Sequence, residues 1–193
     1  MVRRITKYGE QILKTKAAEV TKFDENLREL GSDLVETMYA ENGLGLAAPQ
    51  IGESKRVFAI DMRRRVDTET PCVFAIDGKE LPLDIAMPLI AVNPEVEEIG
   101  EYVIVSEEGC LSFPGIYAEV ERSEAVKMKY KDVDGNPHEL VCEGLFARCV
   151  QHENDHLDGV CFIDLLRSKE LFKIDSKLRK LRKQTREFLK ENK

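Results

Sequence analysis

One short segment, Gln151-His152-Glu153-Asn154-Asp155-His156, limits what this chain can fold into more than any other. Two histidines four residues apart on a helix project from the same face and can bind one metal ion. The chain has only three histidines, and two of them lie here. Apolar residues in 144–150 recur at helical spacing, and Gly159 is a suitable helix end. The sequence therefore predicts a short, mostly buried helix with a metal-binding face.

The glutamate beside the first histidine indicates hydrolysis. Glu153 points into the same site without being needed as a ligand. A metal-activated water, with a carboxylate to accept its proton, is the chemistry of hydrolytic metal sites. An HExxH pattern also arises by chance on charged helices, but a buried histidine pair needs polar partners, and a metal supplies them.

A hydrolytic site keeps three protein ligands, so a third ligand must be found. The position that supplies it in metzincins is Phe162, and Glu170 lies beyond the break at Gly159. Cys149 shares the helical face, but seven residues at 1.5 Å each put it about 10 Å from His156 along the axis. Cys149 is therefore expected to be a pocket or core residue.

Cys110 is the better candidate for the third ligand. It follows the strand-like run 102–105, and Gly109 allows the backbone to turn sharply just before it. Such a turn presents a thiolate at a strand end. A free cysteine that acts as a small apolar residue is the alternative, but it explains neither Gly109 nor the two glutamates that precede it.

A third stretch, Gly43-Leu44-Gly45-Leu46-Ala47-Ala48-Pro49-Gln50-Ile51-Gly52, matches the dinucleotide-binding pattern G-x-G-x-x-A. That interpretation requires a strand before the glycines and a helix after them. An amphipathic helix over 25–42 precedes them instead, and Pro49 falls where the helix should begin. An extended loop of small residues, which a ligand backbone can approach closely, fits better.

These three stretches together resemble peptide deformylase. The family carries GxGxAAxQ, EGCLS and QHExDHL segments in this order, and here they cover about residues 25–165. The resemblance implies that Glu153 is the general acid/base and that Gln50 and the backbone N–H of Leu111 stabilise the oxyanion. It also implies a metal bound by Cys110, His152 and His156, and peptide contacts from Gly43, Leu44, Gly45, Gly109 and Cys149.

The implied reaction releases formate from the N-formylmethionine of nascent peptides. The implied cofactor is one divalent ion, with Fe²⁺ favoured in the cell, although Zn²⁺, Ni²⁺ and Co²⁺ also suit cysteine and histidine ligands. Two alternatives stay open: a zincin-like metallopeptidase and a non-catalytic, metal-stabilised binding protein. Gln50 and the turn at Cys110 argue against the first, and Glu153 argues against the second.

The chain departs from the family in two places. A longer excursion occupies about residues 63–90, for which we expect an extra hairpin near the substrate cleft. Arg148 replaces a residue that is commonly apolar in the family's pocket. It is expected either to alter the pocket lining or to be a surface arginine that extends its charged end into water.

Length and composition fit one α+β domain over residues 1–193, with mixed or antiparallel β-sheets around a central metal-binding helix and a C-terminal helix. The further expected strands are 102–107, 125–133 and 139–142, with a turn at 134–136.

The remaining expectations concern location and partners. No apolar run approaches a membrane span, and five cysteines fit a reducing bacterial cytoplasm. Residues 173–193 hold nine lysines and arginines against three acids, whereas the whole chain carries −7. We expect a basic helix over about 168–191, seated through Leu178, Leu181 and Phe188, that either is simply solvated or docks to ribosomal RNA.

Overall fold

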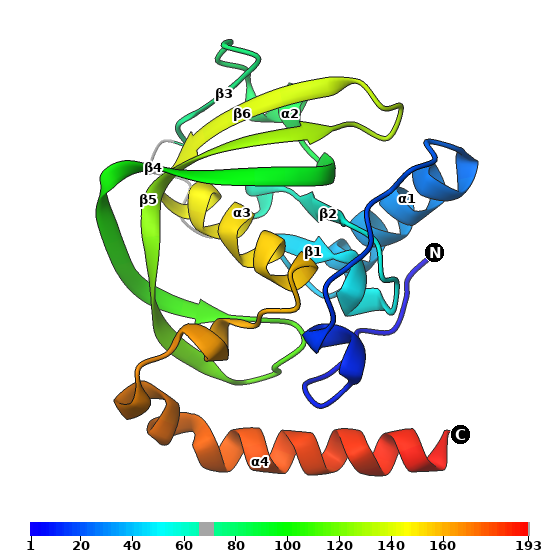
Figure 1. Cartoon of the computed structure of the whole chain (residues 1–193), viewed down its shortest axis with the longest axis vertical. Helices are drawn as coiled ribbons and strands as arrows, with labels where there is room; N and C mark the ends of the chain where they lie inside the picture. Colours follow the sequence, from blue (N-terminus) through cyan, green and yellow to red (C-terminus); the bar gives the residue numbers. More distant parts are fainter. Residues whose placement is uncertain (66–71, 193) are drawn as a thin grey trace.

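The computed structural model describes residues 1–65 and 72–192. The described strands form one six-stranded sheet of antiparallel pairs, in the order β1-β2-β4-β5-β6-β3. Their bounds are β1 Gly45–Ala47, β2 Val57–Ile60, β3 Phe74–Ile76, β4 Leu89–Gly109, β5 Tyr117–Lys131 and β6 Pro137–Glu143. The sheet curves around helix α3 (Gly144–Leu157), as Figure 1 shows. The expected α+β fold around a central helix is confirmed.

Three further α-helices and four 3₁₀ turns lie within the part of the chain that the structure describes. The helices are α1 Glu25–Ala40, α2 Leu83–Ala86 and α4 Ser168–Glu191, and the turns are η1 Gln11–Lys14, η2 Ala48–Ile51, η3 Met62–Arg64 and η4 Phe162–Leu165. No helix among the described residues is both long and apolar enough to cross a membrane.

The paired strands β4 and β5 are longer than expected. They run over 21 and 15 residues, with register shifts between Val92 and Glu95 and between Ile99 and Val103. A bulge of this kind bends a strand and increases its twist. Because both strands bend, the pair curves around α3, and the end of β4 at Gly109 lies close to that helix (Figure 1).

Helix α1 forms where its pattern predicts it. The side chain of Asp24 accepts a hydrogen bond from the backbone N–H of Leu27, which caps the helix start. Apolar residues three and four apart then bury one stripe. The helix ends at Ala40, two residues before the predicted end, because Asn42 adopts φ +56° and turns the chain toward Gly43.

The structure describes only part of the excursion at 63–90. Its first part, 66–71, is outside the described residues. Beyond it, β3 pairs with β6 at the edge of the sheet, and an isolated bridge joins Ile76 to Lys79 in a tight turn. None of the described residues of this excursion lines the large cavity beside α3. The described part of the excursion therefore extends the sheet through β3, and the expectation of a hairpin near the cleft is not met by these residues.

Helix α4 lies along one side of the molecule, apart from α3 (Figure 1). Its buried residues are Ile174, Leu178, Leu181 and Thr185. The expected seat through Leu178 and Leu181 is confirmed, but Phe188 is 41% exposed. The guanidinium of Arg4 lies 5.2 Å from the centre of the Phe188 ring. Phe188 therefore packs against a cation and not against the apolar core.

Candidate active site

The structure brings Cys110, His152 and His156 together. Their ligand atoms all lie within 4.8 Å of one another, and Sγ of Cys110 is 3.3 Å from Nε2 of His156. Helix α3 presents both imidazoles, whose ring centroids are 4.9 Å apart, and the residue after β4 presents the thiol. One sulfur and two imidazole nitrogens at this spacing match the donors and separations of a tetrahedral divalent metal site.

A buried carboxylate orients the first histidine. Oε1 of Glu108 lies 2.5 Å from Nδ1 of His152, which leaves Nε2 of that ring facing the cluster. Arg122 also donates to Glu108, at 2.8 and 3.2 Å. Burial alone would raise the pKa of Glu108, but the hydrogen bonds from His152 and Arg122 hold it well below its usual range. Glu108 is therefore a carboxylate that accepts from His152.

Two buried polar atoms of the site have no hydrogen-bond partner among the described residues, Oε2 of Glu153 and Nδ1 of His156. Glu153 is 3% exposed. Burial raises the pKa of this carboxyl to about 7. An unpartnered buried carboxyl beside three metal-ligand atoms fits a site that holds a metal ion and a water molecule, because both supply the missing polar contacts.

Gly45 is adjacent to that carboxyl. A Cβ atom at this position would lie 2.4 Å from Oε1 of Glu153. Real Cβ atoms do not approach an oxygen so closely, so the missing side chain makes room for Glu153 itself. The approach of a ligand backbone to Gly45 stays a prediction, and the close contact in the structure is with the protein's own carboxyl.

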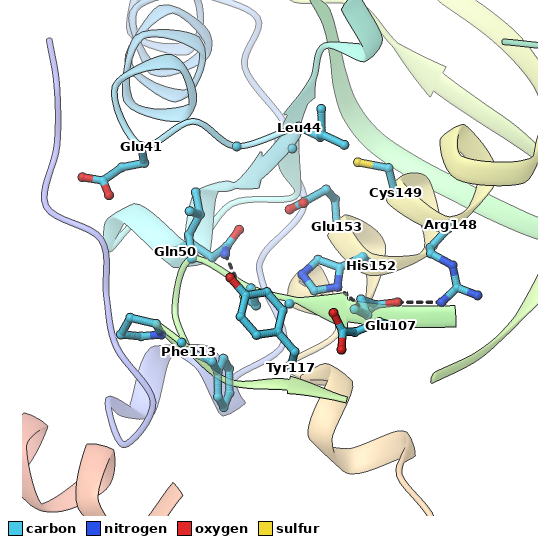
Figure 2. A pocket seen from close by; sticks show the side chains of 18 of the residues that line it. Glu41, Leu44, Gln50, Glu107, Phe113, Tyr117, Arg148, Cys149, His152 and Glu153 are labelled. Carbon is cyan, nitrogen blue, oxygen red and sulfur yellow. Dashed lines mark hydrogen bonds and ion pairs between the residues drawn. The ribbon is translucent and has the colours of Figure 1, made fainter. Parts of the chain in front are cut away.

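Gln50 faces the cluster from the other side. Its Oε1 atom accepts from the backbone N–H of Ala47 at 2.8 Å, which fixes the direction of the amide. Nε2 then points at Sγ of Cys110 (3.3 Å) and Oγ of Ser112 (3.4 Å). Figure 2 shows Glu153 and His152 directed from α3 toward the side where Gln50 lies. Gln50 thus presents a fixed donor to the space beside the thiol.

These groups open into a cavity of about 440 Å³. Every residue that the sequence assigned to peptide contacts lines it, namely Gly43, Leu44, Gly45, Gly109 and Cys149, and so does Leu111. Cys149 belongs to the core as well, and burial raises the pKa of its thiol well above the usual range. A thiol held protonated suits an apolar wall better than a metal ligand.

Arg148 also lines the cavity, but not as a surface residue. It is 8% exposed and donates to Oε2 of Glu108 at 3.1 Å. It also donates to the carbonyls of Ile104 (2.7 Å) and Val120 (3.1 Å). The alternative of a surface arginine was wrong, because Glu108 and two backbone carbonyls of β4 and β5 accept from its guanidinium.

Sequence reasoning missed several residues of the site. Glu108 was noticed only as one of two glutamates before Gly109, and no pattern pointed to Arg122. Lys7 and Tyr117, which also line the cavity, come from segments without a recognisable motif. Only the Glu-Glu pair carried a usable signal, because paired carboxylates beside a proposed metal ligand are candidates to orient a histidine.

Known proteins resemble the chain over nearly its whole length. The sequence profile of the polypeptide deformylase family matches residues 2–171. A peptide deformylase of Opitutus terrae is 42% identical over 193 residues, which is 100% of this chain and 99% of the relative. One of Prochlorococcus marinus (strain AS9601) is 40% identical over 166 residues, or 86% of this chain and 74% of the relative.

Solved structures agree with this relationship. A plant peptide deformylase superimposes with a TM-score of 0.81 at 34% identity, covering 96% of this chain and 91% of the other. The enzyme of Thermotoga maritima gives a TM-score of 0.71 at 41% identity, with 86% and 99% covered. Members of the family depend on a metal ion, in keeping with the Cys/His/His cluster. The chain belongs to the peptide deformylase family and is a hydrolase that removes the N-formyl group from the formylmethionine of newly made polypeptides.

Proposed function

We propose that Cys110, His152 and His156 bind one divalent metal ion and that Glu153 moves the protons of the deformylation reaction. The observation that carries this proposal is the unpartnered, buried carboxyl of Glu153 beside three ligand atoms that lie within 4.8 Å of one another. A divalent ion bound there lowers the pKa of a bound water molecule enough to make hydroxide available near neutral pH.

The residues around the metal site have separate roles in this proposal. Glu153 accepts the proton of the water and returns it to the leaving amine. The amide Nε2 of Gln50 and the backbone N–H of Leu111 donate to the formyl oxygen as it gains charge, a contribution of about 3 kcal/mol per donor in comparable oxyanion holes. Glu108 keeps Nδ1 of His152 occupied, so Nε2 of that ring remains the ligand atom.

The walls of the cavity bind the substrate. The backbones of Gly43, Leu44, Gly45 and Gly109 lie along it and suit an extended peptide. Leu44 and Cys149 offer an apolar surface to the methionine side chain, and Arg148, already bound to Glu108 and to two carbonyls, forms a polar border.

The assignments are tested with anaerobically purified protein and a formyl-methionyl peptide. Glu153→Ala should keep its metal while kcat falls by roughly 10²-fold or more. Gln50→Ala should also keep its metal and lower kcat/KM. Cys110→Ala should lose metal and activity together, and Cys149→Ala is the matched cysteine control. Full turnover in metal-loaded Glu153→Ala, or metal loss only in Cys149→Ala, would show the roles to be wrong.

Ferrous iron is the proposed metal in the cell. One thiolate and two neutral imidazoles leave a divalent site with a net charge near +1, and these donors also accept zinc, nickel or cobalt. Metal analysis of protein isolated without oxygen tests this, and a stoichiometric zinc content would contradict it.

A zincin-like peptidase remains the second candidate, and cleavage of internal peptide bonds without formate release would favour it.

We also propose that the whole chain, residues 1–193, is one catalytic domain that works in the bacterial cytoplasm. The substrate is made there on ribosomes, and all five cysteines are unpaired. Fractionation of cells, followed with an antibody, tests the location. Recovery of the protein outside the cytoplasm would contradict it.

The last proposal is that α4 docks the enzyme to ribosomal RNA. Six of its exposed cations form no ion pair with another described residue, namely Lys169, Lys177, Lys180, Arg182, Arg186 and Lys190. A helix that buries one stripe and leaves cations on the other suits a polyanion. Its binding should weaken steeply with salt, because each phosphate contact releases counterions.

Charge reversal tests this better than truncation. Removing the chain after Ile174 would also remove the buried Leu178 and Leu181. Changing Lys177, Lys180 and Arg186 to glutamate should instead abolish co-sedimentation with ribosomes and leave hydrolysis of a short formyl-peptide unchanged. Glutamate at the exposed Lys16, Lys22 and Lys79 is the matched control. Equal binding of both triple variants at low salt would exclude docking through α4.

A further inference from the structure

The two proposed oxyanion donors come from distant parts of the chain. Gln50 lies in η2, and Leu111 follows β4, about sixty residues later. The two direct hydrogen bonds between these segments are long, since Nε2 of Gln50 lies 3.3 Å from Sγ of Cys110 and 3.4 Å from Oγ of Ser112. Donors of an oxyanion hole lose their effect when displaced by a fraction of an ångström, so their separation must be held by other contacts.

Three consecutive residues near the N-terminus make those contacts. We call Thr6, Lys7 and Tyr8 the N-terminal clamp. On one side, the backbone N–H of Thr6 donates to the carbonyl of Gln50 at 2.8 Å, and its hydroxyl donates to that of Pro49 at 3.0 Å. On the other side, Nζ of Lys7 donates to the carbonyl of Leu111 at 2.8 Å, and the N–H of Tyr8 donates to that of Ser112 at 3.0 Å.

The clamp is itself held in place. The ring of Tyr8 stacks on Phe113, a fully buried residue, with centroids 5.0 Å apart. The backbone N–H of Lys7 donates to Glu10 at 2.7 Å, and Arg4 pairs with the same carboxylate. The position of Lys7 is thus set independently of the cavity, which its side chain lines.

We propose that the N-terminal clamp fixes the oxyanion hole and that Lys7 is its positioning residue on the Leu111 side. This inference rests on the proposed roles of Gln50 and Leu111. A charged donor makes the stronger kind of hydrogen bond to a carbonyl. By holding the carbonyl of Leu111, Lys7 limits the rotation of the turn that carries the N–H of the same residue. Lys7 acts on catalysis through Leu111, without any contact of its own with the formyl group.

Lys7→Met tests the inference, because methionine keeps the apolar stem and loses the donor and the charge. We expect kcat for a formyl-methionyl peptide to fall by about tenfold with little change in KM, as for a lost transition-state interaction. Lys7→Arg should restore most of the rate. Affinity for the deformylated product peptide should not change, because that ligand has no formyl oxygen. Lys16→Met, on the same segment and away from the cavity, is the control.

Metal content and melting temperature are measured for each variant. If Lys7→Met does not fold, Lys7→Gln, which loses the charge but keeps a shorter donor, replaces it, and a smaller fall in kcat is then expected. The double variant with Gln50→Ala should lose less than the product of the two single effects, because both donors depend on one clamp. A rise in KM alone, an unchanged kcat, or strictly multiplicative losses would overturn the inference. If Gln50→Ala alone leaves kcat unchanged, the proposed oxyanion role of Gln50 is wrong, whatever the result for Lys7.

Discussion

At the scale of single residues, the site depends on side chains that must approach one another without intervening atoms. Gly45 is the sharpest case, since its Cα faces the carboxyl of Glu153. Glu153 in turn comes from α3, while Gly45 begins β1. Glu153, the proposed proton carrier, can therefore lie this close to β1 only because Gly45 has no side chain.

Gly45→Ala should consequently damage catalysis more than stability. The new Cβ would lie 2.4 Å from Oε1 of Glu153, so the carboxylate must rotate away from the metal-ligand atoms. We expect kcat to fall by roughly 10²-fold, similar to the loss of a general acid/base, while metal content stays stoichiometric. Gly52→Ala meets no neighbour within 4 Å but adds backbone strain at φ +87°, so it should cost stability while leaving kcat unchanged, the opposite of Gly45→Ala. Normal turnover by metal-loaded Gly45→Ala would show that Glu153 does not need its present position.

Residues within motifs were predictable, and residues that join separate elements were not. His152, Glu153 and His156 are adjacent in sequence, so helical spacing alone places them on one face. Arg122 meets Glu108 only because β4 and β5 pair in one particular register. From sequence alone Arg148 could be a surface residue, because the carbonyls of β4 and β5 that accept from it are distant in the chain. No local pattern contains that information.

At the scale of elements, helices were easier to predict than strands. Helices α1, α3 and α4 have apolar stripes that the sequence displays directly. The strands in the middle of the sheet lack a clear apolar pattern, because charged residues alternate along them. These residues face opposite charges on the neighbouring strand, as Glu95 faces Lys129 and Glu97 faces Lys127. Opposite charges on facing positions stabilise a sheet as apolar pairs do. This alternation of charges hid the first half of β4, 89–101, from prediction.

The edge formed by β3 and β6 should respond to pH through His138. Its Nδ1 lies 2.8 Å from Asp77, beyond β3, and its Nε2 lies 3.5 Å from Asp132, beyond β5. The hydrogen bond to Asp77 raises the pKa of His138, and the pKa values of both aspartates are lowered. A raised histidine pKa adds stability below the ordinary value near 6.5, and that stability is lost as pH rises through the raised value.

His138→Gln should therefore lower the melting temperature more at pH 5.5 than at pH 8.5. Both aspartates remain ionised over this range, and His152 and His156 are present in both proteins, so the difference isolates His138. The cavity beside α3 does not include this residue, and kcat should not change. An equal loss of melting temperature at the two pH values would mean that protonated His138 adds nothing to this edge.

Helix α4 should contribute stability without contributing to chemistry. Leu178 is 5% exposed and packs in a cluster with Phe113, Phe162 and Leu13. Leu178→Ala should lower the free energy of unfolding by about 3 kcal/mol, as for other buried leucines. Because no described residue of α4 lines the cavity, kcat at 25 °C should stay near normal. Denaturant unfolding measures the first effect, and Leu171→Ala, at a position 37% exposed, should cost much less.

At the scale of the whole molecule, the site lies where three apolar clusters meet. Cys149 belongs to the cluster between α3 and the sheet, Leu111 packs against the cluster under α1, and Cys110 packs against the one that α4 covers. Residues from each cluster thus converge on one cavity. This convergence was beyond prediction from sequence, because it depends on how the clusters assemble and not on any one segment.

Metal removal should therefore loosen the whole fold. A ligand bound only by the native state stabilises it by RT ln(1 + [L]/Kd), roughly 4 kcal/mol when free metal exceeds Kd a thousandfold. Here the proposed ligands join the end of β4 to α3, so that stabilisation links the sheet to its central helix. Calorimetry with and without a chelator should show a melting temperature several degrees lower in the chelated enzyme. Cys110→Ala should melt near the chelated value and respond little to chelator. If chelation lowered the melting temperature of Cys110→Ala as much as that of the parent enzyme, the stabilising ion would have to bind elsewhere.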